Sequence, residues 1–288
     1  MFPEAKLKLI DAFKDNNEVV AMTGDGVNDG PALKAAHIGI AMGLRGSEVA
    51  KNVASLIITD DDLVHMTDAV ALGRKIYSTL KKAIQYIVSI HIPIILIVTL
   101  PLLLSWKFTD IFSTVHVIFL ELIMGPTCSI IYENEPMEAG TMQRPPRKIG
   151  ATFLSLKQLS VSIIQGLMIT AGCLGIGYYY LQQGSDNATI RTVIFITLLF
   201  SNIFLTLVNR SFHYSIFIIV SFKNNLVPLI IGITLLLITT LLYIPFIQHL
   251  FLFHLLSLTV IATSIIVAML NILWIEIWKL LRWEAGNN

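Results

Sequence analysis

The sequence has little charge and almost no cysteine. Only 14% of its 288 residues are Asp, Glu, Lys or Arg, whereas soluble globular chains carry about 25%. The formal net charge is +1, which argues against the basic surface of a nucleic-acid-binding protein. The two cysteines, Cys128 and Cys173, lie in apolar runs and are expected to be small packing residues. A disulfide framework is therefore not predicted.

Hydrophobic residues make up 55% of the chain and are unevenly distributed. Residues 1–82 carry regular charges, whereas residues 83–280 consist mainly of long apolar runs. A membrane-spanning helix needs about 20 apolar residues, and six segments fit this length. The predicted spans cover residues 83–105, 112–132, 158–182, 190–208, 226–244 and 253–278. The first apolar run follows a polar segment, so no N-terminal signal peptide is expected.

The polar segment alternates short apolar strands with helical patterns. The predicted strands cover residues 18–22, 38–42 and 55–59, and the predicted helices cover residues 29–36 and 47–54, the latter with Ser47 as N-cap. This alternation indicates a parallel α/β sheet. About eighty residues are too few for a whole doubly wound domain, so we expect the first strands of the sheet to be missing and residues 1–62 to form a partial Rossmann-like segment. Residues 63–82 are predicted to form a stalk helix that continues into the membrane.

The charges between the spans predict an orientation. If residues 1–82 are cytosolic, the segments after the second, fourth and sixth helices are cytosolic too, including the tail 281–288. Eight Lys and Arg residues fall on that side: Arg144, Arg147, Lys148, Lys157, Arg210, Lys223, Lys279 and Arg282. The external loops hold Lys107 and Arg191 alone, in agreement with the positive-inside rule. We expect an integral, multi-pass protein of the plasma membrane, in contact with lipid.

One sequence motif contains candidate metal-binding and phosphate-binding residues. Residues 23–29, Thr-Gly-Asp-Gly-Val-Asn-Asp, directly follow the first predicted strand, and open α/β sheets bind ligands at that position. Asp25 and Asp29 are hard oxygen donors suited to Mg²⁺. Asn28 is a hydrogen-bond donor for a phosphoryl oxygen, and Lys6 is a candidate point charge for the same group. The alternative for this string is an ordinary Asp- and Gly-rich turn.

The motif and its neighbours resemble the P-type ATPases, a branch of the haloacid dehalogenase superfamily, and in particular the calcium-pump-like branch. The matching pieces are Pro3–Lys6, Thr23–Leu33, Ile38–Gly43, Ser47–Lys51, Asp60–Asp62, Gly73–Tyr77 and Arg144–Arg147. The resemblance implies a haloacid dehalogenase-type segment followed by an all-α bundle of six transmembrane helices, the family's last six of ten.

The resemblance also implies roles for individual residues. Phosphate would be bound by Lys6, Thr23, Gly24, Asp25 and Asn28. Mg²⁺, the expected cofactor with ATP as substrate, would be held by Asp25 and Asp29. Lys6, Asn28 and Asp29 would take part in catalysis.

Part of the family's machinery is not found in this sequence. The family's phosphorylated aspartate lies in an Asp-Lys-Thr-Gly-Thr string, which does not occur here. ATP would bind through N-terminal domains supplied elsewhere. Because Met1 falls inside the α/β segment, we expect a split gene, an interrupted reading frame or an incomplete assembly.

The function expected from the resemblance is the C-terminal portion of an ATP-driven cation pump, with calcium as the first candidate ion. Two alternatives stay open: a membrane-tethered phosphatase-like domain, and a truncated, non-catalytic membrane subunit. The DNA upstream of this sequence would discriminate among them, because the pump requires an in-frame segment that encodes the phosphorylated aspartate.

The residues that would contact the transported cation depart from the calcium-pump pattern. Where calcium pumps carry asparagine and glutamate in the fifth helix, this sequence has His91 and Ile94. Where they carry asparagine, threonine and aspartate in the sixth, it has Glu121, Met124 and Gly125. A bare dication needs several oxygen ligands, so a calcium site of that construction is in doubt.

Five residues remain candidates for the ion path: His91, Glu121, Gly125, Pro126 and Asn202. An ionisable residue inside a span is costly and usually functional, which favours Glu121. The Gly125-Pro126 break is expected to expose backbone carbonyls. Packing or structural roles are the alternatives for His91 and Glu121, and polar contact between helices is the alternative for Asn202. A further acidic group, Glu133, Glu135 and Glu138, is expected either to be solvated or to attract cations.

Overall fold

The computed structural model describes residues 2–106, 108–126, 130–147, 150–211, 215–216 and 224–286, with side chains as far as Lys279. The chain forms two compact units. The first contains residues Met1–Lys75 and Ala139–Thr152, and the second contains Ile76–Glu138 and Phe153–Asn288. Predictions that concern Lys107, Cys128, Lys148 and Lys223, and the side chain of Arg282, lie outside the described residues.

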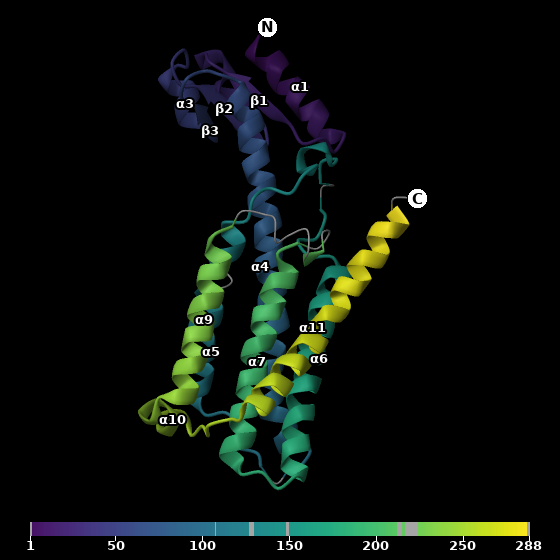
Figure 1. Ribbon diagram of the computed structural model, residues 1–288. Helices are drawn as coiled ribbons and strands as arrows, with labels where there is room; N and C mark the ends of the chain where they lie inside the picture. Colours follow the sequence, from purple (N-terminus) through teal and green to yellow (C-terminus); the bar gives the residue numbers. More distant parts are fainter. Residues whose placement is uncertain are drawn as a thin grey trace. The chain divides into compact units, whose positions relative to one another are not determined.

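The first unit is built around a parallel sheet (Figure 1). Its elements are α1 (Pro3–Asp15), β1 (Ala21–Gly24), η1 (Val27–Asp29), α2 (Gly30–Ala35), β2 (Ile38–Met42), α3 (Glu48–Val53), β3 (Leu56–Ile58) and η3 (Thr141–Gln143). The strand order is β1-β2-β3, with Thr23 opposite Ile40 and Ala41 opposite Ile57. The predicted α/β alternation is therefore confirmed, although three parallel strands show the α/β class and no finer fold.

Local sequence explains the helices of this unit. Ser47 is the N-cap of α3, since its Oγ accepts a hydrogen bond of 3.2 Å from the backbone N–H of Ala50. Pro31 opens α2, where a missing N–H costs nothing. The small core contains Leu33, Ala41 and Ala50. Helix α1 was not predicted as a helix, although Pro3 stands at its first position.

Helix α4 is a single helix of 40 residues, Val64–Leu103. The predicted stalk and the predicted first span are thus continuous, as expected. The boundary between the two units falls within this helix, at Lys75 and Ile76. Pro93 and Pro101 both lie inside it, and each removes one backbone hydrogen bond.

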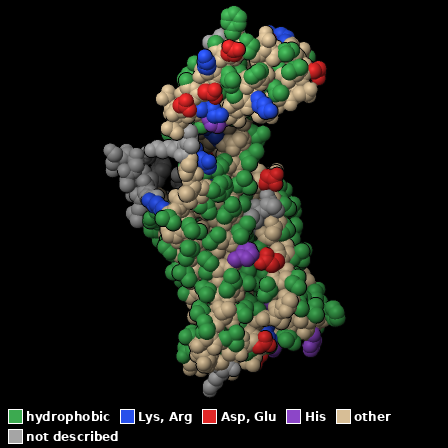
Figure 2. Space-filling view, turned by 180° about the vertical axis from the view of Figure 1, so that it is seen from behind, with side chains coloured by type: hydrophobic (Ala, Val, Ile, Leu, Met, Phe, Trp, Pro, Cys, Tyr) green, Lys and Arg blue, Asp and Glu red, His purple; other side chains and the backbone are tan. Residues whose placement is uncertain are grey.

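The second unit is a helical bundle with an apolar surface (Figure 2). After α4 its helices are α5 (Thr114–Pro126), α6 (Leu156–Gln182), α7 (Asn187–Asn209), α9 (Leu226–Tyr243), α10 (Pro245–Phe251) and α11 (Leu258–Gly286). Helix α7 is the centre of the bundle: 83% of its most apolar stretch is buried, against 28–44% for the other long helices. Helices α6 and α11 both pack against it.

The predicted number of six spans is not matched by the helices of the described residues. Among the described residues, five helices are long and apolar enough to cross a membrane, where the sequence predicted six. The second predicted span, residues 112–132, contains α5, which has 13 residues and is about 20 Å long at 1.5 Å per residue. The apolar core of a bilayer is about 30 Å thick. Residues 127–129, which follow α5, lie outside the described residues, and helical conformation is present at residues 130–133.

The last predicted span also begins in the wrong place. The sequence predicted one helix over residues 253–278, but α11 begins at Leu258 and is preceded by the short helix α10. Leu252, between them, has a positive φ of 51°, a conformation that interrupts a helix. The other predicted spans agree with α6, α7 and α9 to within a few residues.

Candidate functional site

The loop after β1 is organised by Asp29. Its side chain is almost fully buried, with 6% of the residue exposed. One carboxylate oxygen forms an ion pair with Nζ of Lys6 from α1. The other accepts hydrogen bonds from the backbone N–H groups of Asp25, at 3.3 Å, and Gly26, at 3.2 Å. Asp29 thus joins α1 to the loop that follows the strand.

The charge state of Asp29 follows from these contacts. Burial raises the pKa of a carboxyl group, but the hydrogen bonds from Lys6 and from the Gly26 backbone outweigh it, so the pKa of Asp29 is below its ordinary value. Asp29 is therefore ionised at neutral pH and holds the Lys6 ammonium in place. Lys6 keeps 28% of its side chain exposed, which leaves it accessible to an anion.

Gly24 is required by this packing. A Cβ atom built at Gly24 would lie 2.6 Å from the Cβ of Asp29 and 2.9 Å from its Cγ, well inside van der Waals contact. Any side chain at this position would therefore push Asp29 out of its hydrogen bonds.

We expect Gly24→Ala to destabilise the first unit by about 1–3 kcal/mol, the usual cost of overpacking. Hydrogen exchange of the amides in residues 21–42, measured in the whole chain, reports this loss. Gly73→Ala is the matched control, because a Cβ at Gly73 in α4 meets nothing within 4 Å. Unchanged exchange in Gly24→Ala would contradict the packing described for Asp29.

The remaining motif side chains are accessible. Thr23, Asp25 and Asn28 are exposed at the end of β1, and within the described residues the Asp25 carboxylate makes no hydrogen bond or ion pair. The Asp25 backbone is fixed, since its carbonyl accepts a hydrogen bond of 2.7 Å from the N–H of Ser47. A free carboxylate on a fixed backbone suits Mg²⁺, which takes one or two carboxylates and fills its other positions with water and phosphate oxygens.

The structure adds a residue that sequence reasoning did not single out by itself. The carboxylate of Asp61 accepts hydrogen bonds of 2.9 Å from the backbone N–H groups of Leu44 and Arg45. The backbone of Asp61 has a positive φ of 61°. It fixes the loop after β2. Burial raises the pKa of Asp61, but these backbone hydrogen bonds lower it below the ordinary value. Asp60–Asp62 was recognised only as one of the pieces that match the family, without this contact.

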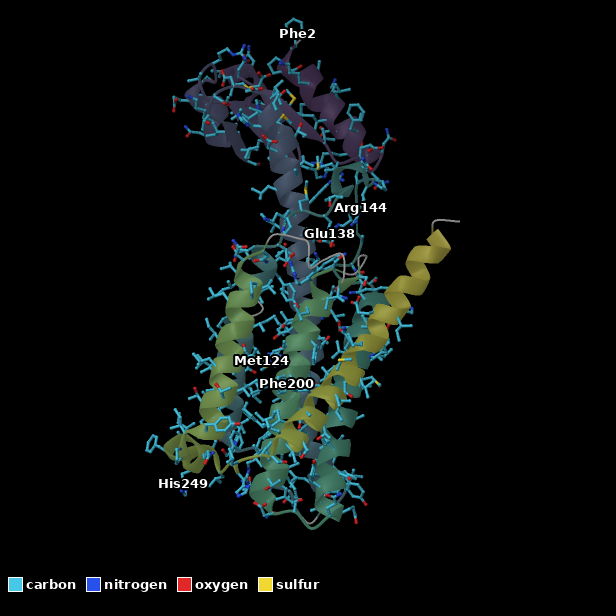
Figure 3. All side chains as sticks on the ribbon, in the orientation of Figure 1. Phe2, Met124, Glu138, Arg144, Phe200 and His249 are labelled. Carbon is cyan, nitrogen blue, oxygen red and sulfur yellow. The ribbon has the colours of Figure 1, made fainter. Side chains whose placement is uncertain are left out.

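In the bundle, the structure brings together two of the candidate ion-path residues. Nε2 of His91 on α4 lies 3.1 Å from Oε1 of Glu121 on α5. Both side chains are about half exposed, at 42% and 48%. Gly125 and Pro126, the last residues of α5, follow Glu121 by about one turn. Met124 is instead buried in the apolar core, and it is labelled in Figure 3.

Asn202 belongs to a different set of contacts. It accepts a hydrogen bond from the hydroxyl of Tyr86, which joins α7 to α4. Ser89, one turn after Tyr86 on α4, donates a hydrogen bond of 2.9 Å to Gln165 on α6. Gln165 in turn donates a hydrogen bond of 2.9 Å to Asn209 on α7. Within the described residues no hydrogen bond links Asn202 to His91 or Glu121. Its contact is the polar bridge between helices that was the alternative for it.

Comparison with known proteins identifies the family. The model of the family described as "Cation transporting ATPase, C-terminus" matches residues 109–281. The chain belongs to this family.

Curated relatives extend the match toward the N-terminus. The chain is 32% identical to Calcium-transporting ATPase 1 of Lactococcus lactis over 86% of its length, and 31% identical to Calcium-transporting ATPase 1 of Saccharomyces cerevisiae over 86%. It is 31% identical to Calcium-transporting ATPase type 2C member 1 of Homo sapiens over 75%. The aligned parts cover 28%, 26% and 23% of those proteins, so the chain spans about a quarter of their length. With five helices able to cross a membrane, it is an integral, multi-pass membrane protein.

The acidic group Glu133, Glu135 and Glu138 was expected either to be solvated or to attract cations, and the structure disagrees with the first expectation for two of its members. Glu133 is exposed, but Glu135 and Glu138 are buried, so a solvated cluster is wrong for those two. Glu135 pairs with Arg210 at 2.6 Å, and Glu138 pairs with Lys82 at 2.8 Å. Sequence alone gave no indication of these pairs, because Arg210 lies 75 residues from its partner.

A third buried ion pair lies in the same bundle. Lys279 on α11 lies 2.7 Å from Glu276 and donates a 2.7 Å hydrogen bond to the carbonyl of Val208. Figure 3 places Glu138 at the opposite end of the bundle from His249. In the predicted orientation, the end that contains Glu138 is the cytosolic one. The Lys82–Glu138 pair joins α4 to the segment after α5, whereas the Glu276–Lys279 pair lies within α11 and reaches α7 through the Val208 carbonyl.

Proposed function

We propose that the chain is the C-terminal portion of an ATP-driven cation pump that couples formation and hydrolysis of an aspartyl phosphate to ion transport. The main support for this proposal is the Lys6–Asp29 ion pair beside the exposed carboxylate of Asp25. The same chain contains helices that are able to span a membrane. The three relatives described above are named calcium-transporting ATPases, and calcium is therefore the first cation to test.

The first unit would act on the phosphoryl group. Lys6, held by Asp29, would place its ammonium against the phosphoryl oxygens, and Thr23, Gly24 and Asn28 would contact them through N–H and hydroxyl groups. Asp25, with Asp29 behind it, would hold Mg²⁺, which supplies positive charge to the phosphoryl oxygens when bound. The phosphorylated aspartate and the nucleotide-binding residues would come from a further part of the pump.

The same proposal assigns the domains. Residues 1–62 would be the C-terminal part of a haloacid dehalogenase-type phosphorylation domain, residues 63–82 a stalk, residues 83–280 the membrane domain and residues 281–288 a tail. Residues 1–82 would face the cytosol, with the plasma membrane as location. The ion path would include Glu121, His91, Gly125, Pro126 and Asn202, and the first two already lie in contact.

Phosphorylation of native membranes tests the proposal. Membranes from the source cells are incubated with labelled ATP and Mg²⁺, with and without each candidate cation, and run on an acidic gel. An antibody against residues 1–82 then locates the chain. We expect a hydroxylamine-sensitive labelled band that carries this epitope, is much larger than 32 kDa and changes with the transported cation. Absence of label from every band that carries the epitope would overturn the proposal and favour a non-catalytic membrane subunit.

A further inference from the structure

The imidazole of His91 is oriented like that of a metal ligand. Its Nδ1 lies 2.8 Å from the carbonyl oxygen of Ile87, one turn earlier in α4. A carbonyl oxygen only accepts, so Nδ1 carries the proton of this bond. Nε2 is then the nitrogen left to bind another group, and it faces Glu121. Histidines that bind metals almost always donate their other ring N–H to a carbonyl or carboxylate in this way.

The contact between the side chains of His91 and Glu121 requires a positive charge from a bound cation or a proton. A neutral Nε2 and a carboxylate are both acceptors, so their 3.1 Å separation is favourable only with a cation or a proton beside them. Residues 83–103 and 114–126, which carry the pair, contain no Lys or Arg. Their other histidine, His116, is hydrogen-bonded to different groups. Within the described residues, no Lys or Arg forms an ion pair with Glu121.

The surroundings leave space for further ligands. Glu121 and Gly125 are four residues apart and therefore lie on the same face of α5, and both are exposed. Among the described residues, a Cβ atom built at Gly125 meets nothing within 4 Å. Water, or a group from a further part of the pump, can therefore approach the pair beside this turn of the helix.

We propose that Nε2 of His91 and the carboxylate of Glu121 are ligands of the transported cation, and that this cation is a first-row transition metal ion such as Zn²⁺ rather than Ca²⁺. The inference rests on the proposed function, since it names the ion that the pump would carry. Ca²⁺ takes six to eight oxygen ligands, and a histidine nitrogen is not among them. Imidazole nitrogen with carboxylate oxygen is a donor set typical of transition metals.

The distances fit this ion class. Two ligands at about 2.0–2.1 Å from Zn²⁺ in a tetrahedral site lie about 3.3–3.4 Å apart. The observed separation of 3.1 Å between Nε2 and Oε1 needs an adjustment of a few tenths of an ångström. Two protein ligands leave two positions open, which suits an ion that must enter and leave.

Metal titration of the intact membrane protein that carries this sequence tests the inference. The protein is purified in lipid nanodiscs and titrated with Co²⁺, which reports its ligands by visible absorption, in the presence of Mg²⁺ to occupy sites such as Asp25. We expect one absorbing Co²⁺ site that a 100-fold excess of Ca²⁺ does not displace. His91→Gln and Glu121→Gln are each expected to weaken Co²⁺ binding at least tenfold. The exposed residues His249 and Glu133 supply matched controls, His249→Gln and Glu133→Gln, which should bind like the wild type.

Three results would overturn the inference: no Co²⁺ site in the wild type, displacement of Co²⁺ by equimolar Ca²⁺, or unchanged binding in both site variants. Glu121→Asp, which keeps the carboxylate, is expected to bind Co²⁺ within a few-fold of the wild type, and this retention separates loss of a ligand from loss of the fold. No ATP is present in the titration. Failure of metal binding is therefore distinguishable from failure of phosphorylation, which is measured in a separate experiment.

Discussion

Replacement of Asp25 by asparagine is expected to lower the rate of phosphoenzyme formation by about 100-fold or more. The substitution keeps the size of the side chain and removes its charge. Neutralisation of phosphoryl charge by a bound metal is worth several kcal/mol, and each 1.36 kcal/mol corresponds to a factor of ten in rate. Rapid-quench measurement of acid-stable label from ATP, in the complete pump, gives this rate.

The expected defect is specific to the chemistry. The Asp25 contact that maintains the fold is made by its backbone carbonyl, which accepts from Ser47, so Asp25→Asn should leave the sheet intact. Asp15→Asn is the matched control, because Asp15 is an exposed aspartate at the end of α1, and its rate should equal that of the wild type. Added Mg²⁺ should partly restore the rate in Asp25→Asn. A rate within about threefold of the wild type would show that Asp25 does not hold the metal.

Short-range features of this chain were predictable from sequence, because local chemistry determines them. The strand near residues 38–42 and the Ser47 N-cap agree with the structure. Helix α1 was missed, although Pro3 at its first position, Glu4 in its first turn and apolar residues at helical spacing indicate a helix. Its importance became clear only through Lys6, which reaches Asp29 across 23 residues.

Long-range features were not predictable in the same way. A hydrophobicity window treats residues 112–132 as one span, because it takes no account of the backbone, whereas the described helix within it, α5, covers Thr114–Pro126. Likewise, the sequence shows that Glu138 is charged, but it does not show that Lys82 on α4 is its partner. His91 and Glu121 were each predicted as ion-path candidates, but the sequence did not predict that they contact each other. For the candidate sites, residue types were predictable and their partners were not.

Arg210→Met is expected to destabilise the bundle by about 3–5 kcal/mol, the cost of leaving a buried charge without its partner. Arg210 and Glu135 each have only 4% of their side chains exposed. Two nitrogens of the guanidinium contact the two carboxylate oxygens, at 2.6 and 3.4 Å. After the substitution, the Glu135 carboxylate would keep the 2.9 Å hydrogen bond from Asn224, which carries no charge. Thermal unfolding in lipid nanodiscs, followed by loss of the monodisperse chromatographic peak, measures the effect.

Two further variants separate burial from charge in this prediction. Arg210→Met combined with Glu135→Met removes both charges, and replacement of a whole buried pair by apolar side chains is often neutral or stabilising, so the double variant should recover most of the lost stability. Lys51→Met breaks a 3.0 Å pair with Glu48, whose side chain is 83% exposed, and should cost at most about 1 kcal/mol. If Arg210→Met cost no more than Lys51→Met, the Arg210–Glu135 pair would not be buried as described, and the end of the bundle that contains it would be open to water.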